Sequence, residues 1–451
     1  MQELRKEYKM KFKLNRTVKV VLMYLLSLVV VAVTQIQTRA EDTDPLLQQK
    51  IEQNNFEKKI YDLVQQEKFD ELEAIIKDLR MNKSKYEDGT SKVYTFYAGA
   101  GKGFDKFSIL DKNKHIDMIK KWMNKTPNSI TPKIVLAEDY ILLAWDYRGS
   151  GYAKDVTDEG VKKFSEYLQK AEKILEEANN SEEKDPALCV EWIRFGMGTG
   201  GYPKSDFYNL VKKSMEIDPL YFSTYKTCSY VLLPRWYGEK GDVEKFAEWV
   251  AEETKEVAGD QMYARVVSAV KGYIGGASFG EVDFSWDRMR KSFEEILAAY
   301  PTNFYMLNEF AWFSVYYKDR ELAKSLFEKI GDRWNEDSVS TWKGKLAFNQ
   351  YKQWVVTGQN YPEPEGVFKN GKREGFFYKY FDNGQVQYKW NYKNGEKEGT
   401  QSEYYENGNL KHTSDFKAGQ YHGYVRMYDI NGTITQEWTY DNGEMLGYKR
   451  Q

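Results

Sequence analysis

The sequence predicts an α+β protein whose two kinds of secondary structure form separate domains, an α-helical solenoid followed by an antiparallel β-meander. From Pro45 to about Gln353, apolar residues recur every three to four positions, which is the period of amphipathic helices. From residue 371 onward, glycines recur at a constant step of 24 residues between segments of alternating polarity, the pattern of half-buried strands. The change of period therefore separates a helical part from a C-terminal sheet.

The composition limits the chemistry that the chain can carry. Its 451 residues are 41% hydrophobic and 30% charged, which fits two or three globular domains and argues against intrinsic disorder. The formal net charge is only −2, so the chain lacks the basic field that would hold nucleic acid. With three histidines and two cysteines, few side chains suit acid–base or metal chemistry near neutral pH. We therefore expect no catalytic residues, no metal site, no cofactor and no nucleic-acid partner.

Residues 1–40 have the three parts of a secretory signal peptide. A basic segment precedes an apolar run of 14 residues, Val20 to Val33, and small residues precede a cleavage site after Ala40. A membrane-spanning helix needs about 20 apolar residues, so this run is short for one. We expect a mature chain that begins at Glu41 and is exported to the periplasm, the cell envelope or the extracellular medium. The alternative is an uncleaved N-terminal membrane anchor.

The helical part is expected to open with a helix pair over about residues 63–79. Segment 81–113 is expected to be irregular, because Asp88-Gly89 and the glycines at 99, 101 and 103 interrupt any long element. Further helices are predicted over residues 115–123, 132–147, 159–178, 185–195, 204–217, 220–232, 242–257, 261–272, 284–300, 303–317, 319–330 and 337–353.

The later helices resemble the tetratricopeptide repeat. Phe293 and Phe327 lie 34 residues apart, the period of that repeat, and Ala311 and Ala323 fall at the small positions where its paired helices cross. The resemblance implies TPR-like helical hairpins over residues 256–355. Stacks of such hairpins usually bind peptides or proteins on a concave face.

A second resemblance covers roughly residues 60–255, within a helical domain that we place at 45–255. Two signatures carry it, AWxxRGxGxA at Ala144–Ala153 and LPRWYG at Leu233–Gly238, and they are similar to those of an uncharacterised bacterial domain of unknown function. That family has no assigned activity, so the resemblance implies a domain type and not a reaction.

Each signature contains an arginine and a tryptophan that form the candidate site. Trp145 and Arg148 lie one helical turn apart, and Arg235 directly precedes Trp236. Either the two pairs form a cation–π pocket for an anionic or aromatic ligand, or they pack a helix junction, with each arginine on a ring and capping carbonyls. The second interpretation is favoured, because cation–π contacts occur roughly once per 70–80 residues in ordinary proteins.

In the C-terminal part, turn residues separate six predicted strands. The Asn-Gly pairs at 383–384, 407–408 and 431–432 are expected to form type I′ hairpin turns, since Asn-Gly tolerates positive φ. A second, looser set is expected at 370–371, 394–395, 418–419 and 442–443, where Ala418 replaces an asparagine and should weaken its turn. The strands are expected over residues 376–382, 385–393, 400–406, 409–417, 424–430 and 433–441.

Aromatic and polar residues alternate within these strands, as Tyr388 and Trp390 do with Lys389. The alternation predicts one buried and one solvated face. Because a single sheet would otherwise leave many rings in water, we expect it to curl over them; docking on the helices and presentation to a partner are the alternatives. The expected internal column of rings consists of Tyr380, Tyr404 and Tyr428.

The run Tyr404–Leu410 and the Gly-x-x-x-Gly spacings resemble the MORN-repeat variant of bacterial proteins. The resemblance covers residues 362–451 and implies MORN-type hairpins. Bacterial chains with this repeat are often labelled antitoxin-like, and eukaryotic relatives are linked to membrane or protein scaffolding. These labels are associations, because a fold does not carry a function.

Other chemical motifs are set aside. The GxGxxG pattern of Gly196–Gly201 follows a helix and not a strand, so a dinucleotide site is not expected. His115 stands alone, and Glu138-Asp139 is typical of a solvated helix face. Cys189 and Cys228 lie on apolar helices, which favours buried free thiols and leaves a disulfide open.

We expect an exported, non-catalytic interaction or scaffold protein that binds a protein partner through its helical-repeat and MORN-type surfaces. The first alternative is a cell-envelope polysaccharide binder, because sugar rings stack on exposed tyrosine and tryptophan. A carboxylate-based hydrolase is the second, weakened because three dispersed histidines assemble no catalytic set. Exposed aromatic side chains would favour the first alternative, and a cleft with paired carboxylates would favour the second.

Overall fold

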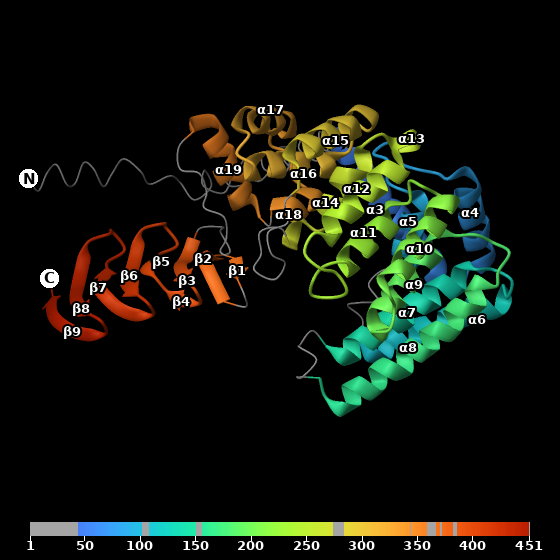
Figure 1. Cartoon of the computed structure of the whole chain (residues 1–451), viewed down its shortest axis with the longest axis horizontal. Coiled ribbons are helices and arrows are strands. Elements are labelled where there is room, and N and C mark those ends of the chain that lie inside the picture. The colour runs from blue at the N-terminus through green and yellow to red at the C-terminus, as the bar shows by residue number, and fades with distance from the viewer. Residues whose placement is uncertain are drawn as a thin grey trace, which may run out of the picture. The chain divides into compact units, whose positions relative to one another are not determined.

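The computed structural model describes residues 44–101, 108–149, 156–273, 284–342, 344–358, 367–369, 372–381 and 386–450. In these ranges every helix precedes every strand, so the helical and β parts are separate along the chain, as expected (Figure 1). No helix of the described ranges is both long and apolar enough to cross a membrane. The expected signal segment, residues 1–40, lies outside them.

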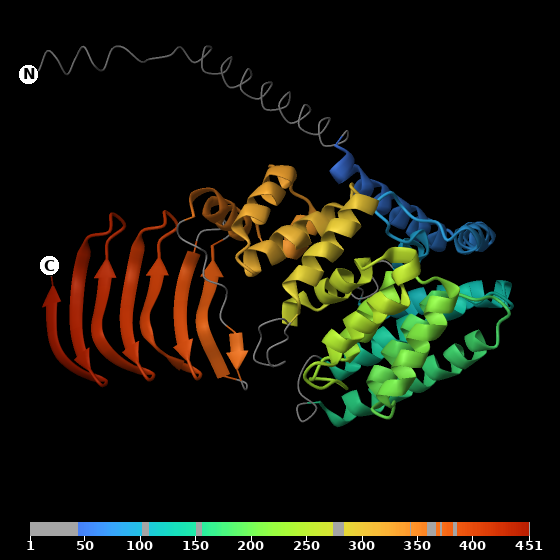
Figure 2. The same cartoon turned by 45° about the horizontal axis from the view of Figure 1, so that its top comes forward.

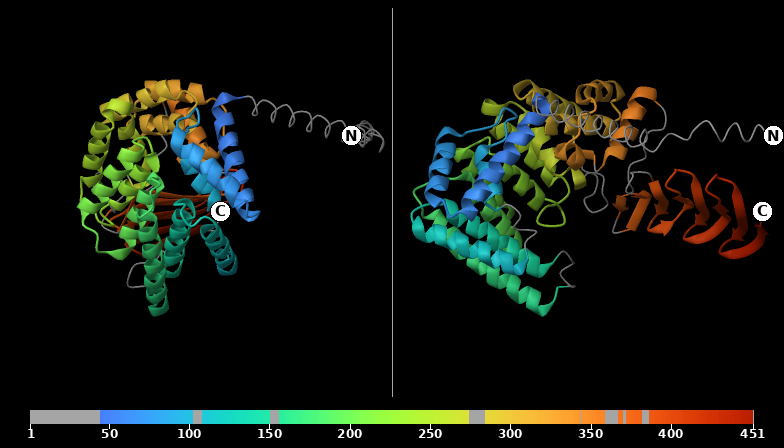
Figure 3. Two further views of the ribbon diagram at one scale, coloured as in Figure 1. Left: turned by 90° about the vertical axis from the view of Figure 1, so that its right-hand side faces the viewer. Right: turned by 180° about the vertical axis from the view of Figure 1, so that it is seen from behind.

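The helices form hairpins of neighbours in the chain. Their bounds are α3 Pro45–Gln65, α4 Phe69–Asn82, α5 Lys92–Ala100, α6 Ile109–Lys125, α7 Thr131–Arg148, α8 Asp158–Asn179, α9 Pro186–Thr199, α10 Lys204–Ile217, α11 Phe222–Val231, α12 Asp242–Glu253, α13 Lys255–Ala258, α14 Gln261–Ala269, the 3₁₀ turn η3 Lys271–Tyr273, α15 Trp286–Ala299, α16 Phe304–Tyr316, α17 Arg320–Ile330, α18 Glu336–Trp342 and α19 Lys345–Thr357. Helix α7 packs against α8, and α16 packs against α17 (Figure 2 and Figure 3).

Polar caps determine where several helices begin. A side-chain oxygen of the preceding residue accepts a hydrogen bond from a backbone N–H in the first turn, which satisfies a donor that has no partner within the helix. At the other end of α7, Gly149 takes a φ of +72° directly after Arg148, the expected end of that helix. The capping residues are Ser108, Thr157, Asp185, Ser285, Asn303 and Asp319.

The expectation that segment 81–113 is irregular is wrong for much of its length, because α5 and the start of α6 lie in it. Gly99, expected to interrupt a helix, lies inside α5. A Cβ atom on Gly99 would lie 2.7 Å from the carbonyl oxygen of Glu57 and 2.8 Å from Cβ of Ile60, both on α3. The glycine therefore permits two helices to cross closely and does not form a turn.

A buried polar network joins four elements of the helical part. Asp185, whose side chain is completely buried, accepts hydrogen bonds from Nε of Arg80 at 2.5 Å and from the hydroxyl of Tyr97 at 2.7 Å. Arg80 also donates to the hydroxyl of Thr131, at 2.6 Å. These residues belong to α4, α5, the first turn of α7 and the cap of α9, so one buried carboxylate fixes where these helices meet.

The residues that resemble the tetratricopeptide repeat are buried at its helix crossings. Ala311 on α16 and Ala323 on α17 have no exposed surface, and Phe293 and Phe327 are buried beside them. The ring of Phe293 stacks on Phe310 of α16, with ring centroids 4.9 Å apart. Small residues at the crossings and rings beside them are what close helix pairing requires.

Cys189 on α9 and Cys228 on α11 are both buried free thiols, as expected. Burial raises the pKa of Cys189 to about 12 and also raises the pKa of Cys228, so neither thiol ionises near neutral pH.

The strands form one antiparallel meander in the order β1-β2-β3-β5-β6-β7-β8-β9, with β4 paired to β3. The six predicted strands are present as β2, β3, β5, β6, β7 and β8, with shifted ends; β1, β4 and β9 were not predicted. Figure 2 shows them as a single layer. The bounds are β1 Val367–Lys369, β2 Lys372–Tyr380, β3 Val386–Lys393, β4 Glu396–Lys397, β5 Gly399–Tyr404, β6 Leu410–Lys417, β7 Gln420–Tyr428, β8 Ile434–Asp441 and β9 Glu444–Arg450.

The two sets of turns have the opposite geometry to the one expected. Asn394-Gly395 and Asn442-Gly443 have positive φ at both residues, 53° and 89° for the first pair and 49° and 88° for the second, which is the signature of a type I′ turn. At the pairs 407–408 and 431–432 only the glycine has positive φ. There the turn is longer and ends in a left-handed glycine. The pair at 383–384 lies outside the described residues.

The loop length explains this inversion. Lys393 pairs directly with Glu396, so only two residues connect β3 to β4, and a two-residue hairpin needs a type I′ or II′ turn. Tyr404 pairs with Leu410, which leaves a longer connection that a single left-handed glycine can close. Asn-Gly suits both turns, so the dipeptide alone does not distinguish them.

Backbone bonds repeat every 24 residues and link successive hairpins. The N–H groups of Gly395, Gly419 and Gly443 donate to the carbonyl oxygens of Arg373, Lys397 and Tyr421, at 2.8, 2.9 and 2.8 Å. The same atoms bond at the same distance in each copy, so the register of the repeat is held by the main chain.

The rings of the sheet lie mainly on one face, which we name the aromatic face. Phe416 and Tyr421 lie 4.5 Å apart, Tyr421 and Tyr440 5.1 Å, and Trp438 and Tyr448 5.3 Å, between ring centroids. The aromatic face comprises Phe377, Tyr388, Trp390, Tyr392, Phe416, Tyr421, Trp438, Tyr440 and Tyr448.

The expectation that the sheet curls and buries these rings is wrong. Of the aromatic face only Phe416, 9% exposed, is buried, whereas Tyr421 is 40% and Tyr448 49% exposed. Tyr404 and Tyr428 are half-buried and form no internal ladder, and the side chain of Tyr380 lies outside the described residues. A single layer without a second layer of side chains has nothing to cover its rings.

Ala418 provides a test of the turn assignment. It has a φ of +48° where the equivalent copies have asparagine, and an L-residue other than asparagine or aspartate is strained there by roughly 1–2 kcal/mol. We expect Ala418→Asn to stabilise the β6–β7 hairpin by about 0.5–1 kcal/mol and to slow amide exchange in it about 2–5-fold. Hydrogen–deuterium exchange of the full chain measures this.

The matched control is Asn442→Ala, which introduces the same strain in the β8–β9 turn and should accelerate exchange there by a similar factor. Unchanged exchange in both variants would contradict a left-handed residue at these positions.

Candidate functional site

The structure brings the two predicted arginine–tryptophan pairs together. Trp145 lies in the last turn of α7, and Trp236 lies in the turn after α11. Their rings meet edge to face, with centroids 5.6 Å apart and planes at 82°. Phe164 of α8 adds an edge contact to Trp145 at 5.1 Å, and Tyr230 lies 6.0 Å from Trp236. Both tryptophans therefore belong to one aromatic cluster at the end of α7.

The arginines lie over these rings. The guanidinium carbon of Arg148 is 5.3 Å from the ring centroid of Trp145, and that of Arg235 is 5.3 Å from Trp236. Arg148 also donates to the carbonyl oxygen of Gly149 at 3.1 Å, in the manner of a helix C-cap. This geometry has the features of the helix-junction interpretation. We name Trp145, Arg148, Arg235 and Trp236 the Trp–Arg cluster.

The cluster keeps unused hydrogen-bonding capacity. The indole Nε1 atoms of Trp145 and Trp236 are buried and have no hydrogen-bond partner among the described residues. Arg235 is exposed, and Arg148 is half-buried. The cluster thus presents one exposed cation, Arg235, beside two buried indole N–H groups, a set suited to an acceptor-rich or anionic group.

The rest of the LPRWYG signature builds the junction, a role the sequence did not reveal. The hydroxyl of Tyr237 donates to the carbonyl oxygens of Gly196 and Met197, at 3.0 and 3.2 Å, near the end of α9. A Cβ atom on Gly238 would lie 1.6 Å from the carbonyl oxygen of Leu232, so only glycine fits there. Tyr237 therefore positions the turn that carries Trp236 against α9.

The glycine-rich segment 196–201 is the end of a helix. Gly196 and Gly198 lie within α9, where a Cβ atom would approach Tyr202 to 2.9 Å and Leu168 to 3.0 Å. Gly200 follows the helix with a φ of +74°, a left-handed C-cap. These glycines serve packing and helix termination.

A second polar cluster, between α6, α7 and α9, was not foreseen. The expectations that His115 stands alone and that Glu138-Asp139 forms a solvated face are wrong: Asp139 is 1% exposed, and its Oδ2 lies 3.5 Å from Nε2 of His115. Arg194 of α9 pairs with Glu138 at 2.5 Å and with Glu191 at 2.9 Å. The signal in the sequence is that the apolar residues of α7 are not confined to one side of the helix, which indicates a largely buried helix.

Burial controls protonation in this cluster. It raises the pKa of Asp139 and of Glu191 well above the ordinary range of carboxylic acids, and it lowers the pKa of His115 to about 4. His115 is thus neutral near pH 7, and burial favours the neutral form of Asp139. Among the described residues, no group of three or more histidine, cysteine or acidic side chains has the geometry to hold a metal ion.

The pH dependence of stability tests the neutral state of Asp139. When the pKa of a carboxyl group is higher in the folded than in the unfolded protein, the group stabilises the fold at low pH. This stabilisation is lost as the pH rises through the pKa of the folded state. We expect Asp139→Asn to remove that loss, so the melting temperature of the variant relative to the wild type rises between about pH 6.5 and about pH 8.5. Above its ordinary pKa of about 6.5, His115 adds no slope in this window.

The control for this measurement is Asp117→Asn, which changes an exposed carboxylate on α6 and should leave the slope unaltered. Identical slopes for Asp139→Asn and the wild type would mean that Asp139 is ionised in the folded protein.

Comparisons with known proteins agree with two of the three resemblances, those to a domain of unknown function and to the MORN-repeat variant. Residues 57–164 match the family model described as a domain of unknown function, DUF4034. The matched range includes Trp145 and Arg148 and ends before Arg235 and Trp236. No curated protein and no solved structure matches the chain. Residues 373–394 and 397–418 match the MORN repeat variant, so the chain combines similarity to DUF4034 with MORN-variant repeats.

Proposed function

We propose that this chain is a non-catalytic interaction protein that binds a protein partner through its repeat surfaces. The observation that carries the proposal is the half-exposed aromatic face. Tyr421 and Tyr448 are 40% and 49% exposed, and Met445, beside them on β9, is 56% exposed. Contiguous exposed apolar surface of this kind marks interaction sites, because a monomer gains by covering it.

The Trp–Arg cluster supports a second contact surface on the helical part. Tryptophan and arginine are the residue types that most often dominate binding energy at protein interfaces. Arg235 is exposed, and the N–H groups of Trp145 and Trp236 lack acceptors within the described residues. A partner with acidic or carbonyl groups would supply hydrogen-bond acceptors at this cluster.

A polysaccharide of the cell envelope is the second candidate, and the exposure of the rings favours it. Sugar rings stack on exposed tyrosine and tryptophan, and cations flank this face: Arg373 lies 5.0 Å from the ring centroid of Tyr392, and Lys397 lies 4.8 Å from that of Phe416. The same face thus suits a protein or a glycan, and the test separates them.

The test compares two double variants of the chain that begins at Glu41, used as baits with envelope extract of the native host. We expect Tyr421→Ser with Tyr448→Ser, on the aromatic face, to lose at least about 90% of a captured partner, the order expected when about 1.4 kcal/mol of binding is lost. Protease treatment of the extract should abolish capture, and periodate treatment should not.

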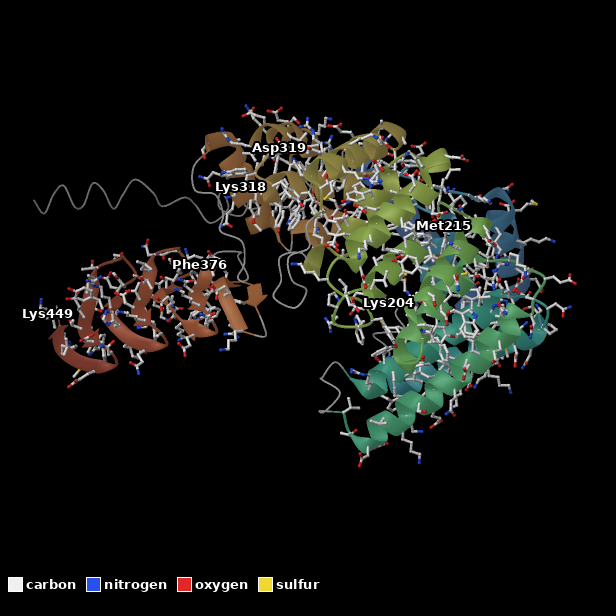
Figure 4. All side chains as sticks on the ribbon, in the orientation of Figure 1. Lys204, Met215, Lys318, Asp319, Phe376 and Lys449 are labelled. Carbon is white, nitrogen blue, oxygen red and sulfur yellow. The ribbon has the colours of Figure 1, made fainter. Side chains whose placement is uncertain are left out.

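The control is Tyr424→Ser with Lys449→Ser on the opposite face of the sheet, where Figure 4 labels Lys449 and Phe376. Capture should survive this change. Loss after periodate alone would favour the polysaccharide, and equal capture by both double variants would refute the aromatic face as the binding surface.

We further propose that the chain is exported. The support is the basic, apolar and small-residue order of segment 1–40. Sequencing the N-terminus of the protein isolated from its native host should give Glu41. A chain that keeps residues 1–40 and fractionates with the membrane would establish the anchored alternative instead.

A further inference from the structure

Arg265 of α14 is buried and forms no ion pair with the described residues. It is 8% exposed, and its guanidinium carbon lies 5.9 Å from the ring centroid of Phe222 and 5.6 Å from that of Tyr300. Its buried Nε has no acceptor, and no carboxylate of the described residues forms an ion pair with it. A charged group in this setting costs free energy unless something compensates it.

Two other arginines of the helical part have a carboxylate partner. Arg288 lies 4.6 Å from the ring centroid of Tyr263 and forms an ion pair with Asp260 at 2.8 Å. Arg80, 11% exposed, bonds to Asp185. Burial also lowers the pKa of Arg265, because it disfavours the charged form. Arg265 therefore differs from these two arginines.

The nearby acidic side chain is engaged elsewhere. The carboxylate of Asp88 accepts hydrogen bonds from Nε2 of Gln53 at 2.7 Å and from the backbone N–H of Thr90 at 2.9 Å. One helical turn beyond Arg265, the hydroxyl of Ser268 is buried and has no partner among the described residues. Two unused donors therefore lie on the same face of α14.

The aromatic wall beside Arg265 is held rigidly. A Cβ atom on Gly89, which has a φ of +82°, would lie 2.8 Å from the ring of Tyr300, so the turn before α5 packs directly on that ring. Asn303 donates to the carbonyl oxygen of Asp88 at 2.7 Å and locks the same contact. The guanidinium is thus fixed before any ligand arrives, which lowers the entropic cost of binding.

We propose that Arg265 is the centre of a binding site for a small oxyanion, a phosphate or a carboxylate group, with Ser268 as a second donor. A planar guanidinium presents paired N–H groups that match the two oxygens of such a group, and rings over its faces leave its edge for the anion. The site is built from residues of α11, α14 and the α15–α16 connection, and it includes none of the sheet residues that carry the proposed function. It does not rest on that proposal.

The test measures thermal unfolding of the chain that begins at Glu41, followed by its helical circular dichroism. Inorganic phosphate and acetate are added separately, with ionic strength matched by sodium chloride. We expect at least one anion to raise the melting temperature of the wild type by roughly 2–4 °C or more. In Arg265→Met the shift should vanish, and its melting temperature in chloride should equal or exceed that of the wild type, because the uncompensated charge is gone.

Arg288→Met is the matched control, a stacked arginine that already has a carboxylate, and it should keep the anion response. Arg265→Lys retains the charge without the planar fork and should weaken the response. If phosphate alone raises the melting temperature, the site binds a phosphate group. If both anions raise it, the site binds small oxyanions in general. No shift in the wild type, or an undiminished shift in Arg265→Met, would overturn the site.

Discussion

The buried bond between Arg80 and Asp185 is the constraint on which the helical part depends. One oxygen of Asp185 accepts the N–H of Ala187 and begins α9, while the other accepts from Arg80 and Tyr97. A fully buried carboxylate is tolerated only when its lone pairs are satisfied, so α4, α5 and α7 must converge where α9 starts. The Trp–Arg cluster lies farther along α7, and the second polar cluster, around His115 and Asp139, lies farther along α7 and α9. The geometry of both clusters depends on this convergence.

The positions of most helices could be predicted, because burial of one face leaves a period of three to four residues in the sequence. Errors arose where a residue's role depends on a partner distant in sequence. In the sequence Gly99 looks like a helix breaker. Only the position of α3 shows that this glycine permits a close helix crossing. Asp139 looks solvated until the side of α7 that carries it proves to be buried. Burial of this kind favours the neutral form of a carboxyl group.

The candidate site was predictable in its residues and not in its assembly. The sequence singled out Trp145 and Trp236, and the structure shows their rings in contact. Nothing in the sequence indicated that Tyr237 caps α9 or that Gly238 packs against the carbonyl oxygen of Leu232. Both residues contact backbone atoms, which no side-chain pattern reveals. The same limit applies to Arg265, since its sequence context looks ordinary, and only the structure shows that its buried Nε has no hydrogen-bond partner among the described residues.

In the sheet, the main chain maintains the register, and this determines how the aromatic face should be interpreted. Bonds from Gly395 and its equivalents recur every 24 residues regardless of the side chains on the faces. Buried polar groups add to them: Gln401, 6% exposed, donates to the carbonyl oxygen of Asn391. Since these contacts hold the strands together, the fold does not require exposed rings such as Tyr421 and Tyr448. The proposed binding surface therefore rests on half-exposed aromatic residues that the backbone register does not require.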